Sequence, residues 1–70
     1  MIEYDYSELC GLITREFGGQ RGFAKALRKS ESHVSMVLNN KIFLRQPEME
    51  QWILTLNVDD PDVGRLFFKH

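Results

Sequence analysis

The chain of 70 residues has a single cysteine, Cys10, so an internal disulfide is excluded. Its two histidines, His33 and His70, lie far apart, and the spacings typical of zinc ligands do not occur. No apolar run reaches the roughly 18 residues that cross a bilayer. The opening MIEYDYSE is acidic and lacks the basic start of a secretory signal. These absences predict a cytoplasmic protein with no metal and no membrane partner.

The groups that carry out catalysis are also missing as a set. Ser32 and His33 are neighbours on an expected helix and point about 100° apart, so they cannot act as a nucleophile and its base. The segment FGGQRG is short and lacks the Gly-Lys-Ser/Thr ending of a phosphate-binding loop. We therefore expect no enzymatic activity and no cofactor.

Apolar side chains make up 43% of the chain and charged side chains 27%, which is typical of a folded globular domain. No internal repeat, linker or low-complexity segment divides the sequence, so we expect residues 1–70 to form a single domain. A chain this short buries a limited core and depends on helices that pack well.

The net charge is −1, but the charges are distributed unevenly along the chain. Residues 1–19 carry four acids and one base, residues 20–45 six bases and one acid, and residues 46–70 five acids and two bases. The net charges of these segments are therefore −3, +5 and −3. A basic middle is typical of a chain that contacts phosphates. Ordinary helices coated with lysine and arginine would give the same count, so charge alone does not decide.

Apolar residues recur at helical spacing throughout the chain, which predicts an all-α fold with four or five helices. The first helix follows an N-cap at Ser7 and ends at Gly18 and Gly19, and the second runs from Gln20 to Arg28. The third runs from a cap at Ser30 to about Asn39. The fourth begins at Pro47, and the last follows a cap at Asp60. Gly22 weakens the second helix by about 1 kcal/mol relative to alanine.

The spacing of the second and third helices predicts a helix-turn-helix. A break of three or four residues separates them, and Ala24 lies ten residues before Val34, with Val37 following. A small residue at Ala24 lets a second helix cross closely at a steep angle, and the two valines would rest on it.

The segment QRGFAKALRKSESHVSMVLNNK resembles the helix-turn-helix of the lambda-repressor-like family of phage repressors and Cro proteins. The residues that fit the family pattern are Gln20, Phe23, Ala24, Leu27, Ser30, Val34, Val37, Asn39 and Lys41. Arg28 and Asn40 depart from it, since the family usually has glycine in the turn and after the third helix, and Lys29 stands where the family often has an apolar residue. A non-glycine residue at positive φ costs roughly 1–2 kcal/mol, so we expect the turn to differ slightly. The opening YDYSELCGLI is also similar to short Cro-like phage proteins.

The resemblance implies a compact lambda-repressor-like domain that binds a double-stranded DNA operator sequence-specifically and regulates phage transcription. Residues 31–39 would enter the major groove, and the protein would be a homodimer at least on DNA. Trp52, Phe67 and Phe68 are candidate dimer contacts, although Trp52 also suits the core. The alternative is a protein-binding helical module, such as a phage anti-repressor, which the acidic ends and the net charge of −1 favour.

The outer face of the third helix is expected to be uncharged in its middle. Ser32, Ser35 and Met36 lie opposite the valines, and hydroxyl and apolar groups suit contacts with base edges. Glu31 can accept a hydrogen bond from a cytosine amino group, and the resemblance places Glu31 and Ser32 among the base-reading positions. The simpler alternatives are that Glu31 complements the helix dipole and that Met36 contacts a protein.

Groups that hold phosphates are expected on both sides of this face. Gln20 and Arg21 begin the second helix, where free backbone N–H groups suit an anion. Lys41 and Arg45 follow the third helix. The complete set of expected DNA-backbone contacts is Gln20, Arg21, Asn39, Asn40, Lys41 and Arg45. Solvated surface is the alternative interpretation for each of them.

Overall fold

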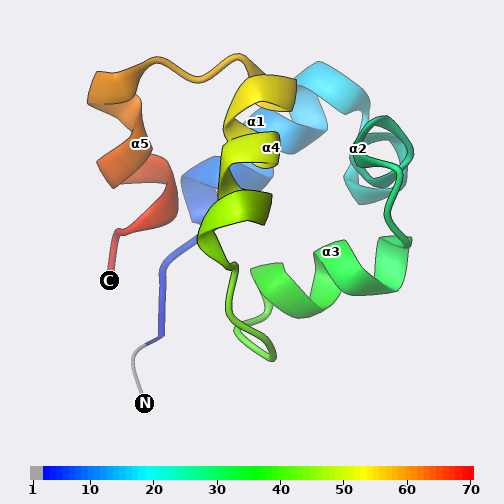
Figure 1. The fold of residues 1–70 in the computed structure, drawn as a ribbon, viewed down its shortest axis with the longest axis horizontal. Coiled ribbons are helices and arrows are strands. Elements are labelled where there is room, and N and C mark those ends of the chain that lie inside the picture. The colour runs from blue at the N-terminus through cyan, green and yellow to red at the C-terminus, as the bar shows by residue number, and fades with distance from the viewer. Residues whose placement is uncertain (1–2) are drawn as a thin grey trace.

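The computed structural model describes residues 3–70, and within that range the chain forms five α-helices and no strand (Figure 1). The helices are α1 (Ser7–Phe17), α2 (Gln20–Leu27), α3 (Glu31–Leu38), α4 (Gln46–Leu56) and α5 (Asp60–Phe67). The predicted all-α class is therefore confirmed. Met1 and Ile2, which the expected domain 1–70 includes, lie outside the described residues. Figure 1 shows α4 in front of α1, with α5 on one side, α2 on the other and α3 below α2.

The core is built around Trp52 of α4, whose side chain is completely buried. Its ring meets Phe23 of α2 and Phe67 of α5 edge to face, at centroid distances of 4.9 and 6.5 Å. Such aromatic pairs add about 0.5–1.5 kcal/mol to the effect of burial alone. Trp52 therefore joins α2, α4 and α5. Trp52 and Phe67 have no exposed surface to offer to a dimer, and of the three candidates Phe68 alone stays exposed.

The corner between α1 and α2 depends on glycine at three positions. Gly18 ends α1 with φ 76°, and Gly19 continues the turn with φ 135°. A Cβ atom on Gly22 would overlap the carbonyl oxygen of Phe17. The sequence indicated only that Gly22 weakens α2. In the structure Gly22 has a further role, because the absence of a Cβ atom lets α2 approach the end of α1.

Two predicted helix caps are displaced by one residue, and one is confirmed. α1 already includes Ser7 and α5 already includes Asp60, so their N-caps are Tyr6 and Asp59. Ser7 instead donates its hydroxyl and its backbone N–H to Asp5 Oδ1. Ser30 caps α3 as predicted, since its Oγ accepts a hydrogen bond from the backbone N–H of His33 at 3.1 Å.

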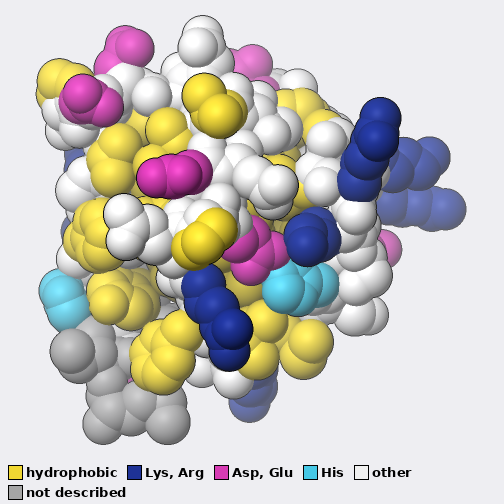
Figure 2. Space-filling view, viewed as in Figure 1, with side chains coloured by type: hydrophobic (Ala, Val, Ile, Leu, Met, Phe, Trp, Pro, Cys, Tyr) yellow, Lys and Arg dark blue, Asp and Glu magenta, His cyan; other side chains and the backbone are white. Residues whose placement is uncertain are grey.

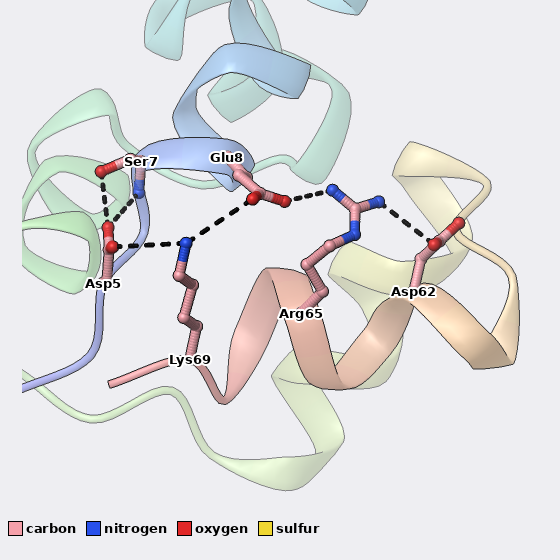
Figure 3. A network of polar contacts seen from close by, with 6 residues as sticks. All are labelled: Asp5, Ser7, Glu8, Asp62, Arg65 and Lys69. Atoms are coloured by element: carbon pink, nitrogen blue, oxygen red, sulfur yellow. Dashed lines mark hydrogen bonds and ion pairs between the residues drawn. The ribbon is translucent and has the colours of Figure 1, made fainter.

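Charged side chains join the start of α1 to the end of the chain (Figure 3). Arg65 of α5 bonds to Glu8 of α1 and lies 3.1 Å from Asp62 Oδ1. Lys69 Nζ lies 3.7 Å from Asp5 Oδ2 and 3.6 Å from Glu8 Oε1. The backbone N–H of Asp5 also donates to the carbonyl oxygen of Lys69 at 2.6 Å. The two basic side chains of residues 46–70 are thus both neutralised within the chain.

No helix among residues 3–70 is both long and apolar enough to cross a membrane. The same part of the chain brings no three of its histidine, cysteine, aspartate and glutamate side chains together in a way that could hold a metal ion.

Candidate functional site

A sharp turn at residues 28–30 connects α2 to α3. Arg28 adopts the left-handed conformation, with φ 60° and ψ 39°, and its N–H donates to carbonyl oxygens of the last turn of α2. The N–H of Lys29 donates to the carbonyl oxygen of Ala24 at 3.0 Å. We expected the turn to differ slightly because of the strain at Arg28. Instead Arg28 carries that strain, since it takes the left-handed conformation that glycine adopts most readily.

The inner face of α3 packs on α2 as the sequence predicted. Ala24, Val34 and Val37 are all at most 2% exposed, and Phe23 and Leu27 complete the buried side of α2. Small Ala24 gives α3 room to cross closely. The two valines thus bury one side of α3 against α2 and leave the opposite side of the helix open.

The outer face of α3 is open to solvent. Glu31, Ser32 and Asn39 are exposed, Met36 is 42% exposed and Ser35 is half-buried. Asn39 Nδ2 donates to the carbonyl oxygen of Ser35 at 2.8 Å and to its Oγ at 3.2 Å. The four predicted base-reading residues therefore share one accessible surface, which we call the α3 face and define as Glu31, Ser32, Ser35, Met36 and Asn39.

The first turn of α3 is tied to α4. His33 Nε2 lies 2.5 Å from Glu48 Oε2, and the two side chains are 30% and 16% exposed. The residues are 15 positions apart in the sequence, so no helical spacing relates them. The available sequence signal was weak: a histidine on the flank of one helix and an acid just after the proline of another. That second helix begins at Gln46, one residue before the predicted start at Pro47.

The chain that leaves α3 is tied to the N-terminal segment. Asn40 has φ 60°, and its side-chain amide exchanges two hydrogen bonds of 2.9 Å with the backbone N–H and carbonyl of Tyr4. The amide that we expected to contact a phosphate is therefore occupied within the chain. Asn40 instead fixes the start of the loop that carries Lys41.

All six basic side chains of residues 20–45 are exposed, and among the described residues none of them forms an ion pair. They are Arg21, Lys25, Arg28, Lys29, Lys41 and Arg45. Figure 2 shows basic side chains toward the edges formed by α2, α3 and the following loop, while acidic side chains lie toward α5 and the α4–α5 connection and also over α4. Gln20 is half-buried at the start of α2, beside exposed Arg21.

One exposed aromatic residue next to this surface was not anticipated. The sequence indicated apolar anchors in the loop after α3, and Ile42 and Leu44 are indeed half-buried, but Phe43 is 67% exposed. A small hollow of about 60 Å³ lies beside it, lined by Tyr4, Tyr6, Asn40, Lys41, Ile42 and Phe43. Exposed apolar side chains in α3 and the loop after it are thus not confined to Met36.

A larger hollow of about 700 Å³ lies between α1 and the α4–α5 region. Its lining includes Leu12, Glu16, Asp59 and Arg65, and none of the predicted site residues. The hollow is therefore separate from the α3 face.

Comparison with known proteins relates nearly all of the chain to a family of unknown function and to one phage protein. A family model described as "Protein of unknown function (DUF739)" matches residues 2–70. The solution structure of the modulator of repression (MOR) of the temperate bacteriophage TP901-1 from Lactococcus lactis is similar, with 37% sequence identity and a TM-score of 0.82. The alignment covers 96% of this chain and 90% of that chain. No curated protein matches.

Proposed function

The chain belongs to the DUF739 family, and from the geometry of α2 and α3 we propose that it is a phage-type transcriptional regulator that binds double-stranded DNA. In this proposal α2 and α3 form a lambda-repressor-like helix-turn-helix, and α3 lies in the major groove. The name of the structural relative, a modulator of repression, supports a role in the control of phage transcription. We place the protein in the cytoplasm of the bacterial host.

One observation carries the proposal. The α3 face is accessible and has no charge in its middle. It lies within residues 20–45, whose six basic side chains are exposed and form no ion pair within residues 3–70. A surface that serves solubility alone more often carries charges in its middle. Base edges require donors, acceptors and apolar groups, whereas the phosphates on either side require cations. The α3 face and its surroundings meet both requirements.

Within the α3 face, Ser32 and Ser35 offer hydroxyl groups, Glu31 accepts from a cytosine amino group and Met36 contacts a thymine methyl group. We assign the phosphates to Gln20, Arg21, Lys41 and Arg45. Asn39 joins them when its exposed amide exchanges its bonds to Ser35 for a phosphate. Asn40 contacts no phosphate in this proposal, since its amide is bonded to Tyr4. It holds the start of the loop that carries Lys41.

We propose that two copies bind as a homodimer on two half-sites. The described chain measures 27 × 25 × 22 Å. Half-sites of helix-turn-helix dimers repeat at about 34 Å along one side of the duplex. A molecule of this size fits within that repeat, so two copies can occupy neighbouring turns of DNA without overlapping.

Fluorescence anisotropy with a labelled duplex tests the proposal. We expect binding at low salt and a linear fall of log K with log salt concentration, with a slope of about −0.9 for each phosphate that is contacted. Ser32→Ala and Met36→Ala should change which duplex is preferred, whereas Lys41→Ala should weaken all duplexes alike. Absence of binding at low salt would contradict the proposal.

A protein-binding module is the second candidate, and the exposed apolar side chains favour it. Met36 of the α3 face is 42% exposed, and Phe43 of the loop that follows α3 is 67% exposed. Such groups are frequent in protein interfaces. The relative's name is compatible with action on another regulator. In that case duplex DNA should not bind, and Phe43→Ser should leave the fold intact while it removes the contact with the partner.

A further inference from the structure

The buried apolar side chains of α3 lie on one side of the helix. Val34 and Val37 bury one side of this eight-residue helix against α2. Isolated helices of that length are marginal in water, so the orientation of α3 depends on its contacts. Apolar packing is not directional, and a short helix held on one side can roll or tilt on it. A second, directional contact is needed to fix where the α3 face points.

The contact between His33 and Glu48 supplies that direction. His33 Nε2 and Glu48 Oε2 are 2.5 Å apart, and this is the side-chain hydrogen bond that joins α3 to α4 among residues 3–70. The bond is partly buried, since the two side chains are 30% and 16% exposed, so water competes little for it. The backbone N–H of His33 is held as well, by Ser30 Oγ.

Glu48 is itself well fixed. It lies in the first turn of α4, directly after Pro47, and its side chain is 16% exposed. Proline begins a helix with its φ already set, and the positive end of the helix dipole favours a carboxylate in the first turn. α4 is anchored in turn by completely buried Trp52. Glu48 thus presents a rigid acceptor to α3.

We propose that His33 and Glu48 are positioning residues that set the sequence specificity of the α3 face, an inference that rests on the proposed DNA binding. His33 directly follows Ser32 and lies one helical turn before Met36. A rotation of α3 that breaks the bond to Glu48 moves those side chains relative to the bases. The phosphate contacts of Arg21 and Lys41 lie outside α3 and depend less on this rotation.

The test compares three variants in one binding assay. Glu48→Ala removes the acceptor, Glu48→Gln keeps an oxygen that accepts from His33, and Glu50→Ala removes the same charge from an exposed position of α4. The measured quantity is the ratio of affinities for a duplex selected from a random pool and for a random duplex. We expect Glu48→Ala to lower this ratio roughly tenfold. Glu48→Gln and Glu50→Ala should leave it unchanged, and equal ratios for all three variants overturn the inference.

A second measurement separates this inference from the proposed function. Amide hydrogen exchange needs no DNA, and it reports opening of each helix separately. In Glu48→Ala we expect faster exchange for residues 33–35 of α3 and unchanged exchange around Leu9 and Ile13 of α1. If the wild-type protein binds no duplex while α3 still loosens in this way, the proposed function fails and the positioning role stands. Unchanged exchange in α3 overturns the positioning role, whatever DNA does.

Discussion

The two ends of the chain and its middle use basic side chains in opposite ways. Arg65 and Lys69, at the C-terminal end, bond to Glu8, Asp5 and Asp62, and together they join α1 to α5 (Figure 3). The bases of residues 20–45 surround α3 without an ion pair in the described part of the chain.

This difference explains how a protein of net charge −1 can present a basic surface. Exposed ion pairs contribute little to stability, about 0–1 kcal/mol each, but they cancel the charge of both partners locally. The +5 of residues 20–45 is not cancelled in this way, so it stays available to an external anion. The following predictions are arranged by the size of the expected effect.

The largest effect is expected where α2 meets α1. Gly22→Ala places a Cβ atom against the carbonyl oxygen of Phe17, and overpacking of this kind lowers the free energy of unfolding by about 1–3 kcal/mol. Gly11→Ala is the matched control, because a Cβ there meets nothing within 4 Å and should stabilise α1 by about 0.5–1 kcal/mol. Urea unfolding measures both variants. A loss of stability in Gly11→Ala as large as in Gly22→Ala would show that the close approach is not the cause.

The turn between α2 and α3 should separate stability from binding. Arg28→Gly relieves a non-glycine residue at φ 60° and should raise the free energy of unfolding by about 1 kcal/mol. The same change removes an exposed base, so DNA binding should weaken. Arg28→Ala removes the charge but keeps the strain, and it should weaken binding without stabilising the fold. Equal stability of the two variants would contradict the strain at Arg28.

Two lysines test the contrast between the middle and the ends directly. Lys41→Ala should lower the salt-dependence slope of duplex binding by about 0.9, which corresponds to one phosphate contact. Lys69→Ala removes the same charge from the network with Asp5 and Glu8 and should leave the slope unchanged. Equal changes in slope would mean that net charge, rather than its placement, governs binding.

The smallest effect is expected for the stability of the fold at acidic pH. Hydrogen bonds from the hydroxyl and then the backbone N–H of Ser7, with help from Lys69, lower the pKa of Asp5 in the folded protein. The resulting stabilisation is present above the pKa of Asp5 in the unfolded chain and is lost as the pH falls through the lowered pKa. Asp5 is half-buried and its side chain is still 39% exposed, so solvent screens the interaction and we expect a small change. Melting temperatures measured from neutral to strongly acidic pH should fall slightly less in Asp5→Asn than in the wild type, and identical profiles would contradict this account.

The helices and the buried side of α3 were accessible from the sequence because both depend on short-range patterns. The spacing of Val34 and Val37 predicts which side of α3 is buried, and Ser30 is a local cap signal. The caps at Ser7 and Asp60 were each placed one residue late, because several polar residues near each helix start can serve as the cap.

The contacts that hold the candidate site in place were not accessible from the sequence. Asn40 binds the backbone of Tyr4 from 36 residues away, and His33 meets Glu48 from 15 residues away. No periodicity connects such pairs, because they depend on how the helices pack. Gly22 was judged by helix propensity alone, whereas its role follows from the position of Phe17.

Amide chemical shifts recorded during titration with a selected duplex test the central claim most directly. We predict that shifts change in α3 (Glu31–Leu38), at Gln20 and Arg21, and from Lys41 to Arg45, while α5 (Asp60–Phe67) is unaffected. Changes confined to α1 and α5, or no change at low salt, would contradict the assignment of the α3 face to DNA.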